Sequence, residues 1–150
     1  MAKKVNKLPR GLRNCNPLNI RYVKGNTWLG CMGSDGAFCK FITMKYGLRA
    51  AFKLLSIYQT KHGKLSIASI IKRWAPENEN NTIHYIKRVC NYMGAKPNDV
   101  FLFGEVVDKE MCCKMVAAMA LVENGEDRLT TQQIHEAWDF TFGEKGGRHD

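Results

Sequence analysis

Glu123 is the residue whose type and position most suggest chemistry. It follows an apolar stretch, residues 115–122, and precedes Asn124-Gly125. A helix that is apolar on all sides is expected to be surrounded by its domain, so this carboxyl group would end a buried helix. Burial and the negative end of the helix dipole both favour its protonated form. Such an acid can protonate the leaving oxygen of a glycosidic bond. The alternative is a side chain in water at a frayed helix end.

Glu79 is the second carboxylate candidate, in a polar loop over residues 76–82. Opposite a catalytic acid it would be the ionised partner that stabilises an oxocarbenium ion or holds water. The alternative is that Glu77 and Glu79 only complement the dipole at the following helix N-terminus. Trp74 and Tyr85 flank this loop, so we expect them to contact substrate, whereas most other aromatic residues should be core.

The elements that must position these residues are mostly helical. Apolar spacing and end signals predict five helices, over residues 43–62, 66–74, 82–94, 108–123 and 130–140. Strands are expected over residues 19–23 and 37–42, the second after a turn at Asp35-Gly36 in which Asp35 is a turn residue. The sequence therefore predicts an α+β, mostly α fold: a small N-terminal β region, then about five helices around a buried central helix. We expect a basic arm over residues 1–13, one domain over 14–142 and a loose tail over 143–150.

The composition restricts the classes of binding partner that are expected but does not identify one. The 150 residues carry 23 Lys and Arg against 14 Asp and Glu, a net charge of +9, which attracts anionic polymers such as nucleic acid or bacterial wall. No nucleic-acid recognition motif is apparent, so no specific nucleic-acid partner is predicted. The six cysteines form no Cys-x-x-Cys pair and the four histidines form no ligand set. We therefore expect reduced, mostly core cysteines and no metal or other cofactor.

Two targeting features are not expected from the sequence. No apolar stretch approaches the roughly 18 residues that a membrane-spanning helix needs. The basic start of the chain is not followed by the apolar region of a secretory signal. We therefore expect synthesis in the cytoplasm, no membrane partner, and delivery to any external substrate by lysis, a virion or a secretion machine.

Residues 10–21, Arg-Gly-Leu-Arg-Asn-Cys-Asn-Pro-Leu-Asn-Ile-Arg, resemble the Arg-Gly-x-Arg-Asn-x-Asn-Pro-x-Asn-Ile-Arg opening of a family of small phage and prophage lysozyme-like proteins. The resemblance continues in order to about residue 135. Further similar segments are Trp28-x-Gly30, Asp35-Gly36-x-Phe38, Tyr46-Gly47-Leu48-Arg49-Ala50, Arg73-Trp74-Ala75-Pro76 and Glu123-Asn124-Gly125. Two positions depart from the family pattern, Cys15 in place of Asn and Leu18 in place of Gly. Because Leu does not easily take a positive φ, the loop around Leu18 is expected to differ.

A more distant likeness is to autolysin-type glucosaminidases, in which a helix ending in a catalytic Glu precedes an Asn-rich strand. Here the Glu-bearing helix comes last, so the order looks circularly permuted, as is feasible when domain termini lie close together. This likeness implies that Glu123 lies beside Asn14, Asn16 and Asn19 across the floor of a cleft.

The resemblance implies an enzyme that cleaves the glycan strand of bacterial peptidoglycan, as a lysozyme-like glycosidase or a lytic transglycosylase. Glu123 would be its general acid and the protein a monomer. The residues implied or expected to bind substrate are Asn14, Asn16, Asn19, Trp74 and Tyr85. A fold does not guarantee activity, so the alternative is a non-catalytic phage structural or wall-binding protein on the same fold. A third interpretation is a basic nucleic-acid binder.

Overall fold

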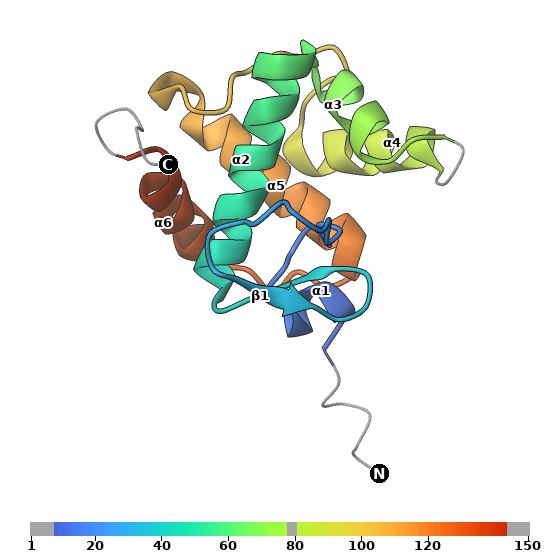
Figure 1. The fold of residues 1–150 in the computed structure, drawn as a ribbon. Helices are drawn as coiled ribbons and strands as arrows, with labels where there is room; N and C mark the ends of the chain where they lie inside the picture. Colours follow the sequence, from blue (N-terminus) through green and yellow to red (C-terminus); the bar gives the residue numbers. More distant parts are fainter. Residues whose placement is uncertain (1–7, 78–80, 144–150) are drawn as a thin grey trace.

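The computed structural model describes residues 8–77 and 81–143. Its elements are α1 (Arg10–Arg13), β1 (Cys31–Ser34), β2 (Cys39–Phe41), α2 (Met44–His62), α3 (Ile67–Trp74), α4 (Thr82–Met93), the 3-10 turn η2 (Val106–Asp108), α5 (Lys109–Asn124) and α6 (Thr131–Phe142). The fold is α+β and mostly α, as predicted. Figure 1 shows α2 and α5 in the middle of the molecule, with α6 on one side and α3 and α4 on the other, and the hairpin beside α1 at one end.

The five predicted helices are all present, with ends displaced by two residues at most. Glycines in the left-handed helical conformation follow three of them, Gly63, Gly94 and Gly125. Such residues adopt the left-handed conformation that ends a helix without steric cost. Ser66 and Thr130 cap α3 and α6 through reciprocal capping boxes with Ser69 and Gln133. Local sequence signals therefore define the helix boundaries.

The core is centred on α5, which packs against α1, α4 and α6. Its inward side chains, among them Cys112, Met115, Val116 and Met119, are fully buried. Complete burial of one such side chain stabilises the fold by about 1.5–3 kcal/mol. The helix is not enclosed on every side, because Glu110 and Lys114 are exposed. Because this face of α5 packs against the core, the packing fixes the orientation of the helix and so the position of Glu123 near its C-terminal end.

The N-terminal region differs from the prediction in three respects. Residues 19–23 form no strand and contribute only a single bridge, from Arg21 to Phe38. Residues 31–34 form β1, antiparallel to β2 with an irregular register beside Gly33; this strand was missed because its residues do not alternate in polarity. Residues 10–13 form α1 with Gly11 and Leu12 buried, so they belong to the domain and not to an arm. The rest of the predicted arm and the predicted tail beyond residue 143 lie outside the described residues.

The loop around Leu18 was expected to differ because Leu does not easily take a positive φ. In the structure Leu18 itself has no positive φ. Leu18 is completely buried, and the described non-glycine residues with a positive φ are Cys15 at 53° and Asn19 at 55°. Asn adopts this conformation more readily than other side chains. The departure from the family pattern that bears on backbone strain is therefore Cys15, not Leu18.

The cysteines are free thiols in the described structure. Cys39, Cys90, Cys112 and Cys113 are buried, and the other two are half-buried. Burial raises the pKa of Cys113 to about 12 and shifts that of Cys112 in the same direction. These thiols therefore stay protonated at neutral pH and pack as small apolar groups. Over the described ranges, no helix combines the length and apolarity needed to cross a membrane.

Candidate active site

Glu123 lies near the C-terminal end of α5, where its half-buried carboxylate accepts three hydrogen bonds. Oε1 accepts from the Asn19 amide, Nδ2, at 3.1 Å. Oε2 accepts from the Trp74 indole, Nε1, at 3.0 Å and from the Tyr85 hydroxyl at 2.9 Å. We call this arrangement the donor cage: Asn19, Trp74 and Tyr85 around Glu123. It joins the N-terminal loop, the end of α3 and the first turns of α4 to the end of α5.

The donors of the cage keep their protons. An indole N–H and a side-chain amide do not titrate near neutral pH. Burial, followed by the negative charge of Glu123, raises the pKa of Tyr85 well above its ordinary value. All three groups therefore remain donors at neutral pH.

The two oxygens of Glu123 are not equivalent. Oε2 accepts two hydrogen bonds, which use both of its lone pairs, whereas Oε1 accepts one. A proton on Glu123 can therefore sit on Oε1 without displacing any of the three donors. The cage thus holds the carboxyl group in one orientation and leaves one lone pair of Oε1 unused.

The bonds from Trp74 and Tyr85 to Glu123 were not foreseen, because these donors lie 49 and 38 positions away from Glu123 in the chain. The contact with Asn19, 104 positions away, was expected from the resemblance.

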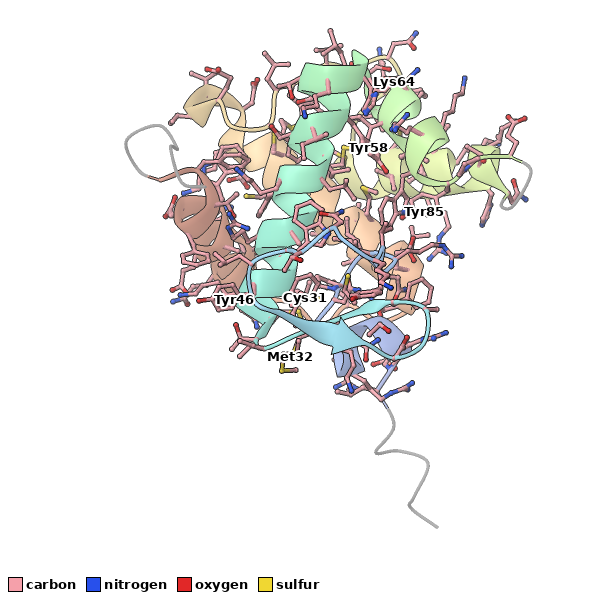
Figure 2. The ribbon with its side chains drawn as sticks, viewed as in Figure 1. Cys31, Met32, Tyr46, Tyr58, Lys64 and Tyr85 are labelled. Carbon is pink, nitrogen blue, oxygen red and sulfur yellow. The ribbon has the colours of Figure 1, made fainter. Side chains whose placement is uncertain are left out.

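A cavity of about 430 Å³ opens beside Glu123. Its walls combine aromatic rings, aliphatic side chains and amides, and Glu123 and Arg21 are its charged residues. The lining consists of Asn19, Ile20, Arg21, Val23, Asn26, Trp28, Phe38, Leu54, Tyr58, Trp74, Ala75 and Glu123. Figure 2 labels Tyr58, a residue of α2 in this lining, and Tyr85, the residue of α4 that donates to Glu123. A cavity of this size and character suits a ligand with flat apolar faces and many hydroxyl groups.

Asn14 and Asn16 do not line the cavity, so the structure does not support the substrate contacts expected of them. Asn16 is completely buried; its amide donates to the carbonyls of Ile20 and Cys39, and its oxygen accepts from the Ile20 N–H. Asn14 is also buried and donates to Asp35. Both side chains are already used within the fold. They shape the loop that presents Asn19, whose expected contact with Glu123 is confirmed.

Asp35 is the centre of a second polar cluster that supports the loop. It accepts a two-pronged ion pair from Arg10, at 2.7 and 3.0 Å, and a bond from Asn14. It also accepts from the backbone N–H groups of Ala37 and Phe38, which confirms its role as a turn residue. The bond from Arg10 is the main reason why the pKa of Asp35 lies well below its usual range. This cluster ties α1 to the hairpin.

Two glycines permit the close packing behind the donor cage. A Cβ on Gly11 would lie 2.6 Å from the Asn124 oxygen and 2.9 Å from the Asn19 oxygen. A Cβ on Gly47, in the first turn of α2, would lie 1.8 Å from the carbonyl oxygen of Cys15. Asn124 in turn donates to the Pro17 carbonyl at 2.9 Å. The loop over residues 14–19, which we call the Asn-rich loop, therefore packs against α2 on one side and against the end of α5 on the other.

Two groups of predicted residues remain to be placed. A third group of residues lines the cavity but was not predicted. Trp74 and Tyr85 were expected to stack on sugar, and the structure instead directs their polar atoms to Glu123, although Trp74 also lines the cavity. Glu79 lies outside the described residues, and its neighbour Glu77 is exposed and absent from the cavity lining. Arg21, Asn26, Trp28 and Tyr58 were not predicted as site residues. Arg21 and Trp28 lie in the similar segments, but nothing in the pattern indicated which way they face.

The described residues contain no group of three or more His, Cys, Asp or Glu side chains that could hold a metal ion. No family model matches the chain. A curated relative, Protein P5 of Pseudoalteromonas phage PM2, is 37% identical over 142 residues, which cover 92% of this chain and 85% of that protein.

Proposed function

The chain belongs to the family of Protein P5 of Pseudoalteromonas phage PM2, and we propose that it cleaves the glycan strand of bacterial peptidoglycan as a lysozyme-like enzyme. The observation that carries the proposal is a single carboxyl group, Glu123, oriented by three donors at the wall of a 430 Å³ cavity.

In the proposed reaction the proton on Oε1 of Glu123 passes to the glycosidic oxygen between two amino sugars. The bond from that oxygen to the anomeric carbon breaks, and its electron pair stays with the leaving sugar. The oxocarbenium ion is then captured by water, or by the 6-hydroxyl of the same sugar, and the proton that this nucleophile loses returns to the carboxylate of Glu123. As the proton leaves, Glu123 becomes negative. The N–H and O–H groups of the donor cage stabilise that charge at the moment it develops.

The cavity lining supports an amino sugar as the ligand. Trp28, Tyr58 and Trp74 offer aromatic rings, and Asn26 offers an amide for hydroxyl and N-acetyl groups. The net charge of +9 favours accumulation at an anionic wall. A phage-related protein of this kind would reach the wall by lysis or in a virion. We retain Asn19, Trp74 and Tyr85 as functional residues, with Asn14 and Asn16 in supporting positions.

The test is digestion of purified peptidoglycan, followed by mass spectrometry of the fragments. Glu123→Gln should lower the cleavage rate by at least about a hundredfold, because the amide cannot donate the catalytic proton. Glu110→Gln is the matched control: it removes a carboxylate from the same helix, far from the donor cage, and should cleave like the wild type. The fragment ends identify the linkage, and an anhydro end distinguishes attack by the 6-hydroxyl from attack by water.

The non-catalytic alternative predicts different results from the same samples. A wall-binding protein would sediment with peptidoglycan and release no fragments, and Glu123→Gln would behave like the wild type. Either result would overturn the proposal. Retention of DNA on filters, with an affinity that falls steeply with salt, would instead favour the nucleic-acid binder.

A further inference from the structure

Arg21 is the residue of the cavity that the proposed reaction does not use. Its side chain is exposed. Among the described residues that line the cavity, Arg21 is the one with a cationic side chain. Glu123, the other charged residue of the lining, is already bonded to three donors. A cation in such a place needs an explanation, because amino sugars without acidic substituents carry no negative charge.

The carboxylate nearest to Arg21 in the sequence, Asp35, already has other hydrogen-bond partners. Asp35 is occupied by two nitrogens of Arg10, by Asn14 and by two backbone N–H groups. These five donors exhaust the roughly four lone-pair positions of a carboxylate. The ion pairs found among the described residues do not include Arg21.

The guanidinium of Arg21 is nevertheless held in place. It lies 5.2 Å from the ring centre of Phe38, and its backbone is bridged to the same residue. Arg10 lies against that ring as well, at 4.5 Å. Stacking on an aromatic ring fixes the plane of a guanidinium and leaves its edge N–H groups available. Arg21 thus lines the cavity, contacts an aromatic ring and takes part in no ion pair found among the described residues.

We propose that Arg21 binds a carboxylate carried by the muramyl sugar, and so makes the cavity selective for muramic acid over plain N-acetylglucosamine. This inference rests on the proposed function. The two sugars differ in the lactyl ether on the muramyl ring, whose carboxyl group is either free or joined to a stem peptide that bears carboxylates of its own. A guanidinium recognises either source through the same two-pronged hydrogen bonds.

The position of Arg21 gives this contact a second consequence. Arg21 follows Asn19 by two residues, and Asn19 donates directly to Glu123. One short segment therefore links the carboxylate-binding group to the acid. Because the two sugars alternate along the strand, fixing the muramyl sugar relative to Arg21 decides which of the two linkages lies at Glu123.

The experiment compares three substrates: intact peptidoglycan, glycan stripped of peptides by an amidase, and a chito-oligosaccharide without carboxylates. Arg21→Gln should lower kcat/KM on the muramyl substrates by about tenfold, mainly through KM, and leave the chito-oligosaccharide unaffected. Arg21→Lys should fall in between, because it keeps the charge and loses the fork. Arg128→Gln, which removes the same charge from a pair with Glu126, is the control and should match the wild type.

Each outcome decides the inference. Loss on stripped glycan identifies the lactyl carboxylate as the source, and loss on intact peptidoglycan alone identifies the peptide. Equal loss on all three substrates, or no loss, overturns it. Failure of the wild type to cleave any substrate would refute the proposed function instead. Calorimetry with a stripped muramyl tetrasaccharide and chitotetraose then still tests recognition, because equal affinities, or affinities unchanged in Arg21→Gln, would exclude it.

Discussion

The hydroxyl of Tyr85 is expected to contribute more to the proposed cleavage reaction than to the free energy of unfolding. It donates to Glu123 from a buried ring. Tyr85→Phe keeps the ring and removes the donor, so we expect the cleavage rate to fall by about tenfold or more. The free energy of unfolding should fall by only about 1–2 kcal/mol, measured in urea. Tyr92→Phe on the exposed side of the same helix is the control, and an unchanged rate in Tyr85→Phe would remove the donor cage from the mechanism.

Asn19 combines a backbone role with a side-chain role, and two substitutions separate them. Asn19→Gly and Asn19→Ala both delete the amide that contacts Glu123, so cleavage should fall equally in both. Only Ala is strained at φ 55°. We therefore expect Asn19→Ala to be less stable than Asn19→Gly by about 1 kcal/mol in denaturant titrations. Equal stabilities would show that the loop relaxes to another conformation.

Asp35 predicts a pH dependence of stability. Its pKa is depressed in the folded protein, chiefly by Arg10 and also by backbone and Asn14 donors. A depressed folded pKa means that stabilisation is present above the unfolded value, about 3.9, and is lost as the pH falls below it. The difference in Tm between wild type and Asp35→Asn should hold from pH 7 to about pH 5 and shrink below about pH 4. A difference that does not change with pH would contradict this.

The close contact between α2 and the Asn-rich loop limits which side chains can replace Gly47. In an exposed helix Gly→Ala would stabilise by about 1 kcal/mol. Gly47→Ala should instead destabilise by about 3 kcal/mol, because its Cβ would overlap the Cys15 carbonyl. Gly63→Ala is the comparison: it meets open space and should cost about 1 kcal/mol through its positive φ alone. If Gly47→Ala proves neutral in thermal unfolding, the close approach is not required.

The elements differ in how far sequence could predict them. The helices were predictable because apolar spacing agrees with local ends, as in α3, which begins after Ser66 and stops before Pro76. The strand at residues 31–34 was not, because Met32 and Ser34 are exposed and Gly33 interrupts the register. The turn Arg10–Arg13 was interpreted as part of a charged arm, although Gly11 and Leu12 are buried by the end of α5 and the Asn-rich loop.

The candidate site was predictable in its membership more than in its geometry. The resemblance placed Asn19 beside Glu123, and the contact is present across 104 residues. Trp74 and Tyr85 were identified because they flank a polar loop, but the direction of their polar atoms depends on how α3 and α4 pack on α5. Asn16 shows the opposite error, because a polar residue in a motif can be consumed entirely by backbone groups.

On the scale of the whole molecule, the net charge of +9 predicts how binding depends on salt. Screening shortens the range of such a field from about 10 Å at 0.1 M salt to about 3 Å at 1 M. The Glu123→Gln protein, in which the proposed cleavage should be lost, is therefore expected to sediment with purified walls at low salt and to be released severalfold as salt rises. Binding that is independent of salt would show that the cavity alone, and not the overall charge, holds the protein on its substrate.

The indole of Trp74 gives the molecule a built-in optical reporter. Its N–H is bonded to Glu123, so its emission depends on the charge of that carboxyl group and on anything that displaces the bond. Trp28 shares the same cavity, whereas Trp138 is 1% exposed in the core. Replacing Trp28 and Trp138 by Phe would leave one chromophore attached to the acid. Ligand entry and proton movement at a single residue would then be visible in solution without a label.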